Sequence, residues 1–175
     1  MNRLLHMVWA PAALLLASVS SRADVVMQPE DESKAAYVLN FVKFVEWPDS
    51  AARDPVTICF VGAEGVHQAL TAGIEKKLVG DKRLIAIQLA SAPAGRCNVL
   101  YIDASMIFDQ APARELAVLT ISDARNFAAA GGMIELFTEN HRLRFRINVD
   151  SAHRAGLRIS SDLLKLAAGV HREPR

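Results

Sequence analysis

The most regular alternation of apolar and polar positions lies close to the C-terminus. Leu143, Phe145, Ile147 and Val149 alternate with Arg142, Arg144, Arg146 and Asn148. A period of two is typical of a strand with one buried face. Met133–Thr138 shows the same period, and a short polar break, Thr138–His141, separates the two runs. We therefore predict an antiparallel hairpin whose second strand carries an arginine face.

The residues after the hairpin predict two short helices. Asn148 or Asp150 can cap the first helix, and Gly156 stands where a helix ends. Ser160, Ser161 and Asp162 offer a second N-cap in front of three leucines, Leu163, Leu164 and Leu166. This punctuation predicts a compact C-terminal unit.

A helical pattern dominates the region before residue 50. Residues 24–32 are polar and contain a proline, which predicts a loose leader. From Ser33 to Glu46 the apolar residues Val38, Phe41, Val42 and Val45 follow the i, i+3, i+4, i+7 spacing of a buried helix face. Pro48 predicts the end of this helix, because the residue before a proline is forced out of the helical region.

The middle of the chain alternates between strand and helix patterns. Strands are expected at Val56–Val61, Arg83–Leu89, Cys97–Ile102 and Leu116–Ile121. Helices are expected at Val66–Ile74 and Asp123–Ala129, with a helical turn at Ser105–Gln110. This rhythm predicts an α/β fold, a three-layer α/β/α sandwich with a mostly parallel sheet that ends in the antiparallel hairpin. A single domain over residues 24–175 is expected.

Residues 1–23 read as a cleaved signal peptide. Arg3 precedes an apolar run from Leu4 to Val19, and Ser21-Arg22-Ala23 places small residues where a signal peptidase cuts. The run is short and contains His6 and Pro11, which disfavours a membrane anchor. We expect an exported mature chain that starts at Asp24 and does not span the membrane.

Composition gives no electrostatic drive toward nucleic acid. The chain has 20 basic and 19 acidic residues, and loss of the signal peptide leaves 18 basic residues. A net charge close to zero gives no global electrostatic drive toward nucleic acid or anionic lipid.

Candidate catalytic and metal-binding patterns are weak. Gly62-Ala63-Glu64-Gly65 lacks the lysine of a phosphate-binding loop and fits a tight turn from strand to helix. The mature histidines, His67, His141, His153 and His171, lack metal-ligand spacing. Serine and cysteine stand in no nucleophile signature. We expect a protein without a cofactor or metal that is not an enzyme, while an unrecognised hydrolase stays open because catalytic groups assemble in space.

Several segments resemble the YfiR/HmsC family of small periplasmic regulatory proteins. They are AAYVLNFVKFVEWPD, VTICFVG, CNVLYID, GGMIELF and RFRINVDSAHRAGLRISSDLLKLA, in the family's order between Lys34 and Ala168. The resemblance implies a regulator that binds the periplasmic sensor domain of an inner-membrane diguanylate cyclase, represses it, and so lowers cyclic di-GMP and biofilm formation. The alternative is a periplasmic small-ligand-binding protein that serves another membrane sensor or transporter.

Cys59 and Cys97 are expected to form a disulfide. Two cysteines in an exported chain are more often bonded than free, and the resemblance implies a cysteine pair at similar positions. Two buried thiols are the alternative. A bond would make the first and third strands neighbours, which favours the flavodoxin-like order 2-1-3.

Two further sets of residues are candidates for binding. Arg144, Arg146, Arg154 and Arg158 form a candidate site for an anionic small ligand, because guanidinium groups bind carboxylate and phosphate in a forked geometry. The alternative is a solvated edge strand whose charges prevent aggregation. Leu164 is the candidate contact with a protein partner, whereas Leu163 and Leu166 are expected in the core. The sequence leaves a homodimer open.

Overall fold

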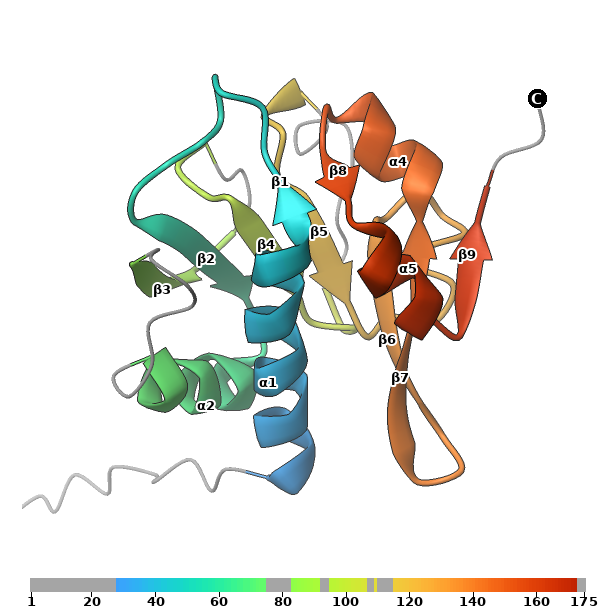
Figure 1. The fold of residues 1–175 in the computed structure, drawn as a ribbon. Helices are drawn as coiled ribbons and strands as arrows, with labels where there is room; N and C mark the ends of the chain where they lie inside the picture. Colours follow the sequence, from blue (N-terminus) through green and yellow to red (C-terminus); the bar gives the residue numbers. More distant parts are fainter. Residues whose placement is uncertain (1–27, 75–82, 92–94, 107–108, 110–114, 173–175) are drawn as a thin grey trace, which may run out of the picture.

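The computed structural model describes residues 28–74, 83–91, 95–106, 109 and 115–172. In this part of the chain a seven-stranded sheet has the order β3-β2-β4-β5-β6-β7-β9 (Figure 1). Its strands are β2 (Val56–Val61), β3 (Leu84–Leu89), β4 (Val99–Ile102), β5 (Leu119–Ser122), β6 (Ile134–Glu139), β7 (Arg142–Asn148) and β9 (Gly169–His171). The pairs are parallel except for β6 with β7, so the sheet is mostly parallel, as predicted.

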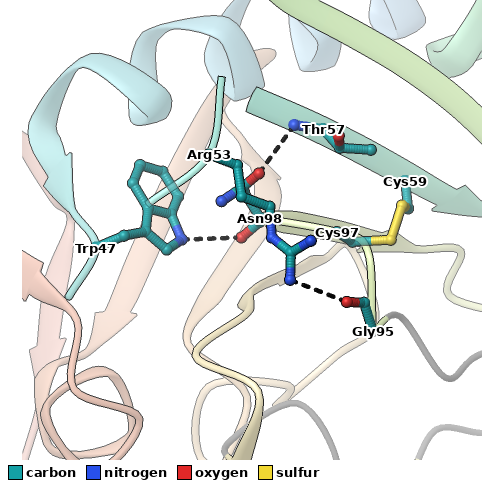
Figure 2. The surroundings of a disulfide bond; sticks show 7 residues. All are labelled: Trp47, Arg53, Thr57, Cys59, Gly95, Cys97 and Asn98. Carbon is teal, nitrogen blue, oxygen red and sulfur yellow. Dashed lines mark hydrogen bonds between the residues drawn. A yellow bond between two sulfur atoms is a disulfide. The ribbon is translucent and has the colours of Figure 1, made fainter. Parts of the chain in front are cut away.

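The first strands of the sheet follow the predicted 2-1-3 order. β2 lies between β3 and β4, and β5 and β6 continue the sheet on the β4 side. Cys59 in β2 is bonded to Cys97, two residues before β4, with 5.8 Å between the two Cα atoms (Figure 2). The order 2-1-3-4-5 is that of the flavodoxin-like folds, in which ligands bind at the carboxyl ends of the parallel strands.

Helix α1 (Pro29–Phe44) packs across one face of the sheet through the predicted apolar stripe. Val38, Phe41 and Val42 are buried within it, and Val45 is buried just after its end. The helix begins four residues before the predicted start. Pro29 occupies its first position, and the first turn contains Glu30, Asp31 and Glu32. Negatively charged side chains there interact favourably with the positive, N-terminal end of the helix dipole. The expected loose leader is therefore helical from Pro29 onward.

The described helices lie on the same face of the sheet. Residues of α1, α2 (Glu64–Ile74), α4 (Val149–Arg154) and α5 (Ser161–Leu166) join one apolar core with alternate residues of the strands. A second core on the opposite face contains Cys59, Cys97, Leu100, Ile102 and Phe127. Within the described residues, a turn segment at 123–131 covers that face where we predicted the helix Asp123–Ala129. This helix prediction was wrong.

The hairpin of β6 and β7 forms as predicted. Its loop consists of Asn140 and His141, which both have positive φ angles, the geometry that matches the twist of the flanking strands. Arg142, Arg144 and Arg146 are exposed, whereas Phe145 and Ile147 are buried. The hairpin does not form the edge of the sheet, because β9 pairs with β7 beyond it.

The predicted helix caps are present in the C-terminal unit. The side-chain amide oxygen of Asn148, Oδ1, accepts from the Ser151 N–H, and Gly156 has a φ angle of +74° where the chain leaves α4. The Ser160 hydroxyl accepts from the Asp162 N–H at the start of α5. Between the two helices, β8 (Arg158–Ile159) pairs with β1 (Val45–Glu46) and ties this unit to the end of α1. No described helix has both the length and the apolar character to cross a bilayer.

Candidate interaction groove

A hollow of about 620 Å³ opens at the carboxyl ends of β5 and β6, beside the N-terminal half of α1. We call it the β6 groove. It is lined by Glu30, Lys34, Asp123, Arg125, Asn126, Glu135, Leu136, Phe137, Thr138, Leu143 and Arg146. Three segments far apart in the sequence therefore meet at the carboxyl ends of the parallel strands, two strands away from the switch point between β2 and β4 at which flavodoxin-like folds bind ligands.

Lys34 of α1 forms one wall of the groove. Its ammonium nitrogen lies 2.6 Å from Asp123 Oδ2 and 2.9 Å from Glu30 Oε1. Burial alone lowers the pKa of Lys34, but the hydrogen bonds to Asp123 and Glu30 outweigh it and raise the pKa above its usual value. Lys34 is thus a fixed positive charge that holds α1 against the end of β5.

Arg146 of β7 forms the opposite wall. Its Nη1 donates to Glu135 Oε1 at 2.9 Å, and its guanidinium carbon lies 3.7 Å from the centre of the Phe137 ring. Glu135 is buried, and its second oxygen accepts from the Ala128 N–H. The Arg146 side chain is therefore held between a carboxylate and an aromatic face.

The segment after β5 closes one end of the groove. Asp123 accepts from the Ala104 N–H as well as from Lys34, which fixes the chain where β5 ends. Arg125 then stands exposed on the rim. No hydrogen bond or ion pair to Arg125 is found within the described part of the chain. The guanidinium group of Arg125 therefore lines the β6 groove with its N–H donors exposed to solvent.

Tyr101 of β4 lies in the core near this end of the sheet. It is fully buried, its ring stacks on Phe60 with 5.7 Å between centres, and its hydroxyl has no hydrogen-bond partner among the described residues. Burial raises the pKa of the Tyr101 hydroxyl, and the negative charges of Asp123 and Asp103 raise it further. The hydroxyl therefore stays neutral.

The four arginines predicted to bind an anion lie on three different elements, β7, α4 and β8. Arg144 is near Glu139 on the hairpin, Arg146 lines the β6 groove, and Arg154 donates to Ser151 in α4. Arg158 in β8 donates to Glu46 through both Nε, at 3.0 Å, and Nη2, at 2.5 Å. Each thus has a partner within the fold, and anion binding by this set stays a prediction.

Helix α5 places the three leucines differently from one another. Leu163 is buried, as predicted, and Leu164 is half-buried against the main core. Leu166 is 65% exposed, so the prediction that it packs in the core was wrong. The helix has only six residues and the chain turns extended at Ala167, which leaves Leu166 at its outer end.

The other candidate motifs also have structural positions. Gly62 has a φ angle of +67°, and a Cβ atom there would lie 2.7 Å from the Asp103 Cβ, so this glycine serves the tight turn between β2 and α2. The mature histidines lie on α2, the hairpin loop, α4 and β9. Within the described residues, no three histidine, cysteine or acidic side chains are grouped to hold a metal ion.

Sequence analysis missed Lys34, Asp123 and Arg125 as groove residues. Lys34 falls within the helical pattern that begins at Ser33, and Asp123 is the first residue of a predicted helix. The available signal was the position of Asp123 directly after a buried strand, because polar residues at the carboxyl ends of parallel strands gather at one edge.

Comparison with known proteins supports the fold. The model of the YfiR/HmsC-like family matches residues 31–168. The crystal structure of a conserved domain protein from Vibrio cholerae O1 biovar El Tor strain N16961 is similar, with a TM-score of 0.54 and 11% sequence identity. The match covers 81% of this chain and 60% of that protein, so this chain spans less than two thirds of its length. At this identity the likeness shows the fold alone.

Proposed function

Because the chain belongs to the YfiR/HmsC-like family of periplasmic regulators, we propose that it binds and represses the periplasmic domain of an inner-membrane diguanylate cyclase. The match to the family model carries this proposal, since it spans strands β2 to β7, the disulfide and the helices α4 and α5. Residues 1–23, the signal peptide predicted from the sequence, lie outside the described residues, and export to the periplasm with cleavage before Asp24 is part of the proposal.

The architecture supports a binding role. A regulator of this kind needs a rigid body that presents a surface, and it shifts its target only if it binds the inactive state better than the active one. Ordered charge pairs hold both walls of the β6 groove, so a partner meets a preformed site with little ordering cost. That the protein is not an enzyme stays a prediction that follows from the family.

The proposal is tested by capture and by cyclic di-GMP measurement. The purified protein, fixed to a resin, is expected to retain a membrane diguanylate cyclase from detergent-solubilised membranes of the source organism. Deletion of the gene is expected to raise cellular cyclic di-GMP several-fold, and expression from a plasmid to restore it. Unchanged cyclic di-GMP after deletion, or capture of a receptor or transporter without a cyclase, would instead support the alternative of a ligand-binding protein for another membrane system.

Helix α5 is the proposed apolar contact with this partner. Leu164→Asp is expected to leave the protein folded, because Leu164 is only partly buried, and to weaken capture of the cyclase about tenfold or more, because a charge would enter the proposed apolar contact with the partner. Leu166→Asp is the matched variant, because that side chain is already 65% exposed and its loss does not affect the core.

Melting curves and cyclic di-GMP levels of both variants separate the outcomes. A Leu164→Asp protein that fails to fold would assign Leu164 to the core alone. If both variants fold and repress fully, the partner surface does not include α5.

A further inference from the structure

The lengths of two adjacent strands leave part of a sheet edge open. β5 ends at Ser122, which pairs with Glu135, whereas β6 continues for four residues to Glu139. Figure 1 shows the β6–β7 hairpin extending beyond the end of β5. Within the described part of the chain, no strand lies beside β6 after Glu135 on that side.

The register of the hairpin shows which main-chain groups face this open edge. In an antiparallel pair, successive residues alternate in pointing their N–H and C=O groups toward and away from the partner. The Phe145 carbonyl accepts from Ala168 N–H and the Leu143 carbonyl accepts from the Tyr37 hydroxyl, so both point away from β6. Their partners across the pair are Leu136 and Thr138. These two therefore direct main-chain groups away from β7, toward the β6 groove.

Thr138 is the residue beyond the reach of β5. Its N–H and C=O face the groove, and no hydrogen bond from another described segment reaches either group. A donor and an acceptor on an open strand edge are the groups that an added strand uses. The two-residue loop keeps this part of β6 in a regular ladder with β7, so the edge is held in the geometry that pairing requires.

The groove beside this edge suits an extended peptide. Three residues of β6 span about 10 Å. The side chains of such a peptide alternate between two faces. Side chains on one face of the bound peptide would contact Leu136 and Leu143, and those on its other face would contact Phe137 and Arg146.

The charges on the rim favour an acidic residue in that peptide. Lys34 and Arg146 are already paired with carboxylates, whereas Arg125 has no ion pair or hydrogen bond among the described residues. A carboxylate on the bound segment would give Arg125 a charge-assisted hydrogen bond.

We infer that the β6 groove binds an extended, acidic segment of the partner's periplasmic domain as an added strand beside Leu136–Thr138, with Arg125 on its carboxylate. The inference rests on the proposed function, because the cyclase is the partner that supplies the segment. Recognition through main-chain groups explains how a groove with balanced side-chain charges binds a protein.

Amide hydrogen exchange tests the main-chain contact directly. Isotope-labelled protein is measured by NMR alone and with the purified periplasmic domain of the captured cyclase. The Thr138 N–H is expected to exchange about tenfold or more slowly in the complex. The Phe137 N–H is the internal control, since it faces β7 and is protected in both states.

Two substitutions test the same contact by affinity. Thr138→Pro removes the donor at an edge position that tolerates proline, and a loss of about 3- to 10-fold in affinity is expected. Thr138→Ala is its control, because it removes the side chain and keeps the N–H. Arg125→Ala is expected to weaken binding about 10- to 100-fold, the effect of losing one charge-assisted hydrogen bond.

The possible outcomes separate this inference from the proposed function. If the complex forms but Thr138 exchange and the Thr138→Pro affinity are unchanged, strand addition is wrong and the proposed function stands. Protection that grows with protein concentration without the partner would assign the edge to a second copy of the chain. Small carboxylates that compete without protecting Thr138 would assign the groove to a small anion. Failure of the cyclase domain to bind the unaltered protein would overturn both proposals.

Discussion

Reduction of the bond between Cys59 and Cys97 is expected to lower the free energy of unfolding by about 2–4 kcal/mol. The bond closes a span of 38 residues, for which restriction of the unfolded chain is worth about 4 kcal/mol in the chain-entropy model. A domain of this size has a total stability of about 5–15 kcal/mol, so the loss is a large fraction of it. Urea titrations of the oxidised and reduced protein measure the difference.

The variant in which both cysteines are replaced by serine provides the control. It is expected to match the reduced protein in stability, and dithiothreitol is expected to leave its unfolding curve unchanged. If oxidised and reduced proteins unfold at the same urea concentration, the bond adds nothing beyond the second core in which both sulfurs are buried.

The position of the bond explains why so much of the topology could be predicted from the sequence. A covalent link between Cys59 in β2 and Cys97 just before β4 brings these two strands together, which leaves few possible strand orders for a parallel sheet. The structure has the predicted order. Periodicity was equally informative in α1 and β7, because their predicted apolar stripes face one core. In these elements local preference and tertiary packing agree.

The segment 123–131 shows where local preference fails. Its sequence contains alanines and an aspartate in a capping position, which favour a helix. In the structure Asp123 is instead bonded to Lys34 and Ala104, Asn126 has a φ angle of +62°, and Phe127 packs into the second core. These contacts come from residues up to 89 positions away, so no local pattern could reveal them.

The candidate site was less predictable than the fold for a related reason. The β6 groove exists because β5 stops earlier than β6, and ends of strands are the least certain part of a sequence-based prediction. The sequence identified Arg146 but not its partner Glu135, nor the open edge at Thr138. The four predicted arginines were grouped by their order along the chain, whereas a binding site depends on which strand ends meet in space, and of the four only Arg146 lines the β6 groove.

The second large effect is expected at Asn98, beside the disulfide (Figure 2). Asn98 is 1% exposed, and its side chain accepts from the Thr57 N–H at 3.0 Å and donates to the Ala51 carbonyl at 2.9 Å. Its own carbonyl accepts from the Trp47 indole at 3.2 Å. This residue therefore joins β2, the approach to β4 and the loop that follows α1.

Asn98→Ala is expected to lower the free energy of unfolding by about 2–4 kcal/mol, because it leaves the buried Thr57 N–H and the Ala51 carbonyl without partners. Arg53→Ala is the matched control. It removes a hydrogen bond of 3.0 Å to Gly95 in the same region, but on an exposed side chain, and a change below about 0.5 kcal/mol is expected. Urea titration measures both variants.

A loss below about 1 kcal/mol for Asn98→Ala would mean that water replaces the amide and that the loop after α1 is held by other contacts. A loss in the expected range would show that the buried Asn98 amide holds the loop after α1. This loop connects the sheet to α1, which forms one wall of the β6 groove.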